Sequence, residues 1–144
     1  MENLIYEHRI QYYETDQMKI VHHSNYIRWF EEARVFTLEE AGLGYDKMEA
    51  MGIISPVLGI NADYKSMSRF SETVEIETTV SKYNGIKLAL SYTIRDKATK
   101  EIRCVGESRH CFLDTEGNVI SLKRSFPEVH RLFEEMLKAD EYFF

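Results

Sequence analysis

The sequence predicts an α+β fold in which one long helix packs against an antiparallel sheet. Apolar residues recur every three or four positions between residues 25 and 41, which is the period of an amphipathic helix. Apolar and polar residues then alternate in three consecutive stretches, 57–64, 74–81 and 87–94, as in half-buried strands. Because these strands follow one another without intervening helices, we expect a meander of four or five antiparallel strands, not an α/β order.

The N-terminal part is expected to begin with a strand, Ile5 to Tyr13, and to continue as an irregular polar stretch. The long helix should begin near Asn25, with Ser24 as the candidate N-cap, because a serine hydroxyl can accept a hydrogen bond from the first helical turn. The apolar stripe of this helix consists of Tyr26, Trp29, Phe30, Ala33, Phe36, Thr37 and Ala41. Glycines 42 and 44 are natural helix stops, and a short helix over residues 45–51 should follow.

Turn residues separate the later elements. The pair Asn84-Gly85 suits a tight hairpin, since both residue types tolerate positive φ. A further strand is expected from Arg103 to Leu113, followed by a turn and a short strand from Val119 to Leu122. The segment 125–128 reads Ser-Phe-Pro-Glu, a pattern typical of a capping box, and it should open a C-terminal helix.

Composition limits the classes of function. The 144 residues suit a single domain spanning 1–144, and 44% of them are apolar, which is enough for a sizeable core. The 18 Lys and Arg residues against 24 Asp and Glu residues give a net charge of −6, which argues against a nucleic-acid partner. Two cysteines without a CxxC pair give no support for a zinc site or a disulfide framework. No signal peptide or membrane-spanning stretch is apparent, so we expect a cytoplasmic protein.

One polar stretch before the long helix could carry chemistry. Residues 13–26 read Tyr-Glu-Thr-Asp-Gln-Met-Lys-Ile-Val-His-His-Ser-Asn-Tyr, which places the carboxylate of Asp16 in a loop that leads to a helix N-terminus. Backbone N–H groups of a first helical turn lack intrahelical partners and are suited to hold a developing oxyanion. A carboxylate beside them could attack a carbonyl or activate water. The segment 106–110 fails the GxSxG pattern of serine hydrolases at its last position.

This stretch closely resembles the signature of hotdog-fold acyl-CoA thioesterases of the 4-hydroxybenzoyl-CoA thioesterase-like family. Members read T-D-x-x-G-x-V-x-H-x-N-Y before the central helix. The matching residues here are Thr15, Asp16, Val21, His23, Asn25 and Tyr26. The similarity covers nearly the whole chain and includes the helix start 29–34 and the loop 64–72. It implies a hotdog fold, an antiparallel sheet of about five strands wrapped around one long central helix, plus a C-terminal helix.

The resemblance also implies roles for individual residues. Asp16 would be the nucleophile or the general base, and sequence does not choose between these roles. The backbone N–H of His23 would polarise the thioester oxygen, while its ring either orients water or braces the loop. Asn25 would fix the loop or cap the helix, and Tyr26 would line the acyl pocket or pack in the core. His22 is expected to be a solvent-exposed residue or a wall residue.

Substrate binding and assembly follow from the same resemblance. The reaction would be hydrolysis of an acyl-CoA or acyl carrier protein thioester, without a metal or redox cofactor, in a homodimer or homotetramer whose sites lie at subunit interfaces. Phosphates of CoA need a local basic cluster on this acidic chain. The candidates for it are Lys65 and Arg69, with Lys82, Lys123 and Arg124 as further cations.

Two alternatives stay open, and a departure from the family pattern, Lys19, keeps the second of them open. Lys19, Ser71 and Met67 stand where the family usually has Gly, Gly and Pro, and Glu72 replaces a usual Asp. If the glycine position requires positive φ, Lys19 would distort the loop or narrow the site. One alternative is a hotdog dehydratase or isomerase with a histidine base. The other is a non-catalytic acyl-thioester binding protein.

Overall fold

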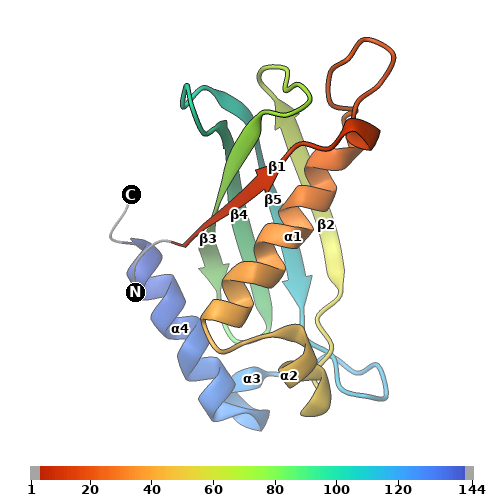
Figure 1. The fold of residues 1–144 in the computed structure, drawn as a ribbon. Helices are drawn as coiled ribbons and strands as arrows, with labels where there is room; N and C mark the ends of the chain where they lie inside the picture. Colours follow the sequence, from red (N-terminus) through yellow and green to blue (C-terminus); the bar gives the residue numbers. More distant parts are fainter. Residues whose placement is uncertain (1–3, 142–144) are drawn as a thin grey trace.

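Five strands form one antiparallel sheet, and the long helix α1 lies across one of its faces (Figure 1). The computed structural model describes residues 4–141. The α+β class and the arrangement of a five-stranded sheet with one long helix are confirmed. The strands are β1 (Ile5–Arg9), β2 (Val57–Tyr64), β3 (Thr73–Tyr83), β4 (Lys87–Asp96) and β5 (Ile102–Cys111). The helices are the 3₁₀ helix η1 (Tyr12–Glu14), α1 (Ser24–Glu40), α2 (Tyr45–Ala50), α3 (Leu122–Ser125) and α4 (Pro127–Glu141).

The sheet is not a simple meander. Its strand order is β1–β3–β4–β5–β2, so β2 pairs with β5 and lies at one edge, while β1 pairs with β3 at the other. The pairing of β2 with β5 runs from Val57 opposite His110 to Tyr64 opposite Cys104, and it contains a bulge between Val57 and Gly59. The chain therefore crosses from one edge of the sheet to the other by way of α1 and α2.

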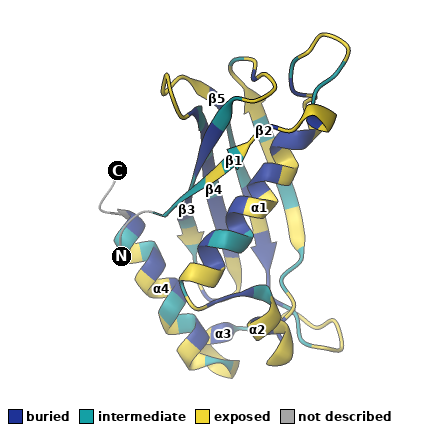
Figure 2. Ribbon diagram, viewed as in Figure 1, coloured by how far each residue is buried: buried dark blue, intermediate teal, exposed yellow. Residues whose placement is uncertain are grey.

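The core lies between α1 and the sheet. Trp29, Phe30 and Ala33 of α1 are fully buried, and Figure 2 shows the buried face of this helix turned toward the strands. The ring of Phe30 stacks on that of Tyr92 in β4, with centroids 4.5 Å apart. A Cβ atom on Gly106 of β5 would lie 2.7 and 2.8 Å from two ring atoms of Phe30. This glycine therefore lets α1 approach β5 closely at Phe30.

Near the N-terminus the structure corrects two boundaries. The first strand ends at Arg9, and residues 12–14 form a 3₁₀ helix, in which the side chain of Glu14 is buried. Helix α1 begins at Ser24, one residue earlier than expected, so His23 occupies the N-cap position. The Ser24 hydroxyl contacts Nδ1 of His22 at 2.9 Å and makes no capping bond.

Further corrections concern the turns and the C-terminal part. In the β3–β4 hairpin only Gly85 has positive φ, at 91°. The fifth strand ends at Cys111, and residues 119–122 form no strand: Val119 makes one isolated bridge with Leu113, and Leu122 begins α3. Ser125 is the last residue of α3, so the expected capping box does not open α4, which begins at Pro127.

Helix α4 packs against β3. At the bulge of β3 the Val80 N–H donates to Oδ2 of Asp140 over 2.7 Å. No helix within residues 4–141 is long and apolar enough to cross a membrane.

The two cysteines, Cys104 and Cys111, are free, buried and carried by β5. Burial raises the pKa of the Cys104 thiol to about 12.

Candidate active site

The loop that precedes α1 folds back on itself around Asp16. The Asp16 N–H donates to the carbonyl of Ile20 over 2.9 Å, and the Lys19 N–H donates back to the Asp16 carbonyl over 3.0 Å. Lys19 closes this turn with φ of 65°. Oδ1 of Asp16 accepts the Met18 N–H at 2.8 Å, while Oδ2 makes no hydrogen bond within residues 4–141. One carboxylate oxygen is thus fixed by the turn, and the other has no hydrogen-bond partner among the described residues.

Glu14 anchors this loop from beneath. Its Oε1 accepts the Gln11 N–H at 2.8 Å and meets Nε2 of His8 at 2.8 Å, and its Oε2 accepts Nε1–H of Trp29 at 2.7 Å. Burial alone would raise the pKa of Glu14, but the bonds from Gln11, His8 and Trp29 outweigh it, so the pKa lies below its usual value. This buried carboxylate ties η1 to β1 and to α1.

Asn25 fixes the end of the loop, one of the two roles expected for it. Its side chain is buried, and Nδ2 donates to the Glu14 carbonyl at 2.9 Å and to the His22 carbonyl at 3.3 Å. The His22 N–H also donates to the Glu14 carbonyl, over 2.9 Å. These hydrogen bonds therefore fix the segment between Asp16 and the start of α1.

The helix start presents an unused donor. In the described part of the chain, the backbone N–H of His23 has no hydrogen-bond acceptor. The His23 ring stacks on that of His22, with centroids 4.3 Å apart, and the Tyr64 hydroxyl donates to the His23 carbonyl at 3.3 Å. A free N–H at the start of a 17-residue helix carries partial positive charge and can stabilise an oxyanion.

A surface cavity of about 590 Å³ opens beside the turn, and we call it the Asp16 cavity. It brings together Asp16 and Asn25 of the expected site residues, while His23 lies next to it through its stacking on His22. Its lining consists of Tyr12, Tyr13, Thr15, Asp16, Gln17, His22, Ser24, Asn25 and Arg28.

Tyr26 lies in the core of this monomer. It is 4% exposed, its ring meets that of Trp29 with centroids 5.0 Å apart, and its hydroxyl donates to Oγ of Ser68 at 3.2 Å. The same burial raises the pKa of Tyr26, so its hydroxyl stays protonated. Within one chain, Tyr26 is therefore a core packing residue in the first turn of α1.

Lys65 and Arg69 line a different cavity, of about 500 Å³, together with Tyr64 and Arg103. The bridge between Ile20 and Arg69 and the bond from the Val21 N–H to the Ser68 carbonyl, 2.8 Å, place it against the Asp16 turn. Neither Lys65 nor Arg69 forms an ion pair with a described residue. Lys82 lies in neither of these two cavities, and Lys123 and Arg124 belong to α3.

Several lining residues were not predicted from the sequence. Arg28 follows Ser24 by four positions, so the helical period places both on one face, and that signal could have identified it. Tyr12 and Tyr13 are 77% and 80% exposed because they belong to η1 and not to a strand. Among the described residues no group of three or more His, Cys, Asp or Glu side chains is placed to hold a metal ion.

Comparison with known proteins identifies the family. Residues 10–139 match the model of the thioesterase-like superfamily. A Bacillus subtilis (strain 168) protein named "Putative acyl-CoA thioesterase YneP" is 36% identical over 133 residues, covering 92% of this chain and 96% of the relative. The crystal structure of a DHNA-CoA thioesterase from Staphylococcus aureus superposes with a TM-score of 0.89 at 31% identity, covering 97% of this chain and 94% of the other.

A third comparison agrees at lower coverage. The acyl-CoA thioester hydrolase YbgC of Escherichia coli O157:H7 is 24% identical over 86 residues, or 60% of this chain and 64% of the relative. The resemblance based on the residues around Asp16 is therefore confirmed over nearly the whole length. The chain has the hotdog fold and the class of a thioester hydrolase, and it belongs to the thioesterase-like superfamily.

Proposed function

We propose that this chain hydrolyses acyl-CoA thioesters to a free acid and CoA, with Asp16 as the reacting carboxylate. The observation that carries this proposal is the fixed Asp16 turn, which leaves one carboxylate oxygen free beside a cavity at the start of α1. The names of the Bacillus relative and of the Staphylococcus structure support the reaction class.

The chemistry requires few groups. The His23 N–H would donate to the thioester carbonyl oxygen and stabilise the negative charge that develops there. Asp16 would either take a proton from the attacking water or attack the carbonyl carbon itself, giving an anhydride that water then opens. In both routes the C–S bond breaks and CoA leaves as a thiolate. A thiolate is a good leaving group, so a strong general acid is not needed.

Asn25 would act through the loop that it fixes, and Lys65 and Arg69 would bind the phosphates of CoA or the acidic surface of an acyl carrier protein. Their cavity adjoins the Asp16 turn through the Ile20–Arg69 bridge, which supports this assignment. Tyr26 would reach the acyl group only if substrate binding exposed its ring. A cytoplasmic location stays a prediction.

We also infer a homodimer or homotetramer. Strand β2 is an edge strand of eight residues, and its apolar side chains Val57, Leu58 and Tyr64 are 48%, 51% and 48% exposed. An unpaired edge with apolar side chains is a template for pairing with another chain. Antiparallel pairing of two β2 strands about a two-fold axis would cover this edge in both copies.

The test of the Asp16 proposal is the substitution Asp16→Asn. It keeps the shape of the turn, since an amide oxygen can still accept the Met18 N–H, but it removes the charge. We expect turnover on acyl-CoA and aryl-CoA thioesters to fall by at least about a hundredfold with little change in the Michaelis constant. The measurement is thioester hydrolysis over a panel of acyl groups and both carriers, with circular dichroism to verify folding.

The matched control is Glu49→Gln, an exposed carboxylate on α2. It removes the same charge and should leave turnover unchanged. A folded Asp16→Asn variant with wild-type turnover would remove Asp16 from the mechanism. If no thioester in the panel were hydrolysed by the wild-type chain but one were bound, the protein would be a binding protein.

A further inference from the structure

The ring of His8 in β1 joins two carboxylates that come from different elements. Its Nε2 is 2.8 Å from Oε1 of Glu14 in η1, and its Nδ1 is 3.3 Å from Oε2 of Glu32 in α1. The ring also packs on that of Trp29, with centroids 4.8 Å apart, and the His8 side chain is 11% exposed. Both nitrogens of a largely buried histidine therefore meet carboxylates, and the proposed reaction uses neither contact.

The contact with Glu14 requires a proton on Nε2 of His8. Oε1 of Glu14 also accepts the Gln11 N–H at 2.8 Å, and Oε2 accepts Nε1–H of Trp29 at 2.7 Å. Both oxygens of Glu14 thus act as acceptors, as they do in an ionised carboxylate, which has no proton to donate. The lowered pKa of Glu14 agrees with this charge state. The His8 ring is therefore the donor in its bond to Glu14.

The contact with Glu32 requires a second proton, on Nδ1. Oε2 of Glu32 also accepts the Tyr6 hydroxyl at 3.1 Å, so this oxygen too acts as an acceptor. A neutral imidazole with its proton on Nε2 would point the lone pair of Nδ1 at a carboxylate oxygen, which is repulsive. An imidazolium instead donates from both nitrogens. The two contacts are satisfied together only when the His8 ring carries two protons and a positive charge.

The other groups around His8 favour the same charge. The neighbouring strand β3 presents the fully buried, apolar Val74 opposite His8. Burial and then the charge of Glu32 raise the pKa of the Tyr6 hydroxyl, so this group stays protonated and neutral. Arg28 precedes Glu32 by one turn of α1 and makes no ion pair with a described residue. The two carboxylates therefore outweigh the one cation on α1, and a negative surrounding favours the charged form of a histidine.

The contacts of His8 reach the Asp16 turn through η1. The backbone carbonyl of Glu14 accepts Nδ2–H of Asn25 at 2.9 Å, and Asp16 follows Glu14 by two residues. A displacement of η1 therefore moves both the Asp16 carboxylate and the segment that leads into α1. Because Glu32 belongs to α1 itself, the His8 ring holds η1 at a fixed place relative to the helix whose start lies beside Asp16.

From these contacts we propose that His8 is a positioning residue of the active site, which acts as an imidazolium between Glu14 and Glu32. In this state it holds η1 against α1 and keeps Asp16 in place. When the ring loses one proton, its bond to Glu32 is lost and the Asp16 turn loosens. The positioned state is therefore favoured at lower pH and declines as the pH rises through this titration. The effect on turnover rests on the proposed function, whereas the charge of His8 does not.

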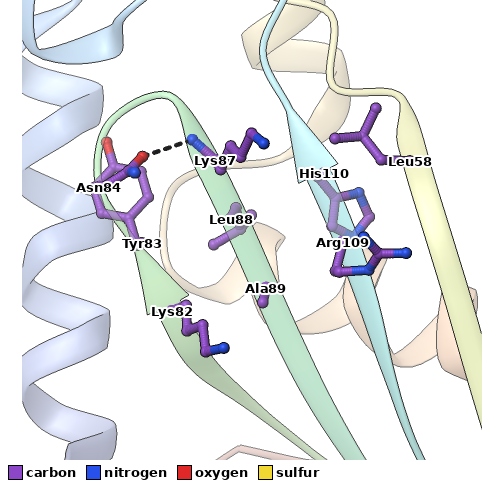
Figure 3. A pocket seen from close by; sticks show the side chains of 9 residues that line it. All are labelled: Leu58, Lys82, Tyr83, Asn84, Lys87, Leu88, Ala89, Arg109 and His110. Atoms are coloured by element: carbon purple, nitrogen blue, oxygen red, sulfur yellow. Dashed lines mark hydrogen bonds between the residues drawn. The ribbon is translucent and has the colours of Figure 1, made fainter.

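The first experiment measures the charge of His8 without a substrate. Nitrogen chemical shifts of the histidine rings are recorded by NMR in the full chain across neutral and alkaline pH, and the His8 signals are identified by their absence in His8→Gln. We expect two protonated ring nitrogens on His8 at neutral pH. His110 of β5, labelled in Figure 3, is the internal reference, because burial and then the charge of Arg34 lower its pKa to about 4. It should show one protonated nitrogen throughout.

The variant Glu32→Gln tests the second carboxylate. The Glu32 side chain is 45% exposed, so this variant should fold. It should lower the pH at which His8 loses its second proton by about one unit. The matched control is Glu40→Gln, which removes an exposed carboxylate from the last residue of the same helix and should leave that pH unchanged. A single protonated nitrogen on His8 at neutral pH would overturn the proposal, and so would an equal shift in both variants.

The second experiment follows thioester hydrolysis against pH. In the wild-type chain kcat should decline on the alkaline side, with the midpoint that NMR gives for His8, while the Michaelis constant changes little. His8→Gln should lower kcat about tenfold at neutral pH and remove this decline. His8→Arg keeps a positive charge at every pH used and has donors for both carboxylates, so it should restore kcat to within about threefold and show no decline.

The kinetic and spectroscopic outcomes are separable. An alkaline decline that persists unchanged in His8→Gln would contradict the positioning role, even with two protons on the wild-type ring. If His8→Arg does not fold, Glu32→Gln supplies the second kinetic test, since its decline in kcat should move to lower pH by the shift that NMR records. If the wild-type chain hydrolyses no thioester, the proposed function fails, and the NMR titration still decides the charge of His8.

Discussion

Lys19 and Ser71 hold a backbone conformation for which glycine is the usual residue. Their φ angles are 65° and 66°, in the left-handed region that costs an ordinary side chain about 1–2 kcal/mol. The Lys19 turn persists because the Asp16 N–H and the Lys19 N–H both take part in backbone bonds. The resemblance marked both positions as departures, and the structure shows that the backbone keeps the glycine-like conformation. Lys19 is exposed, so the closed turn accommodates its side chain on the surface.

Glu14 is expected to contribute to stability in a pH-dependent way. Replacing it by Gln should lower the free energy of unfolding by about 1.5–3 kcal/mol near neutral pH, because the side-chain N–H₂ group would face the donors of Gln11 and His8. The pKa of Glu14 is lowered in the folded chain, so its contribution is complete above its usual value of about 4.3 and is lost as pH falls through the lowered one.

The measurement is urea unfolding of the wild-type and Glu14→Gln chains across this pH range. The difference in unfolding free energy between the two chains should shrink as the solution becomes acidic. A difference that stays constant with pH would mean that the Glu14 carboxylate is not the source of the effect.

At this scale the sequence identified the candidate groups of the site better than the residues that support them. Asp16, His23 and Asn25 stood out because they match a motif and lie at a helix start. Glu14 did not, because it fell in the irregular stretch after the expected strand, where its side chain had no assigned direction, and only the turn of η1 directs it inward to Trp29. Local periodicity has no information about such a turn, since the partners of Glu14 are as many as 15 positions away.

The close contact between α1 and β5 depends on glycine at position 106, which has no side chain. Gly106→Ala should destabilise the fold by about 1–3 kcal/mol, because its Cβ would enter the space of the Phe30 ring and approach the Asn61 carbonyl. Relief requires α1 to move outward, which would also shift His23 at its start. We therefore expect turnover to fall together with the melting temperature.

The partner of this variant is Phe30→Leu, which removes the ring. In the double variant the destabilisation should be smaller than the sum of the two single effects, as measured by urea unfolding. Strict additivity would show that Phe30 is not the group that Gly106 accommodates.

Elements were predictable where one period extends over many residues. The bounds of helix α1 and of strands β2, β3 and β4 agree with the predicted ranges to within a few residues. The pairing of β2 with β5 was not predictable, because a strand pattern shows which face is buried and not which neighbour it joins. The short strand expected at residues 119–122 was wrong for a similar reason: Val119 is 62% exposed, so its side chain has no sheet face to cover.

At the scale of the whole molecule, the free edge of β2 leads us to expect an oligomer in solution. The substitution Val57→Lys places a charge on this edge, where it should oppose pairing between two copies. Light scattering should then show a smaller mass than that of the wild-type chain, and turnover per chain should decline as the oligomer dissociates.

Val119→Lys is the control, since Val119 is also an exposed valine but lies outside β2. It should leave the mass unchanged. A wild-type chain that is monomeric at micromolar concentration and still turns over would contradict the assembly. An unchanged mass in Val57→Lys would instead place the contact on another surface.

The two free cysteines of β5 can be used to detect the separation of this strand from its neighbours. Cys104 and Cys111 are both buried, and the raised pKa keeps the Cys104 thiol protonated, so a thiol-specific reagent reaches neither sulfur while β5 stays between β4 and β2. Alkylation of Cys104, which is fully buried, then requires molecules in which β5 has separated from a neighbouring strand. Its rate therefore follows the population of that opened state. The unmodified chain thus allows the cooperativity of its sheet to be followed by mass spectrometry, without any introduced label.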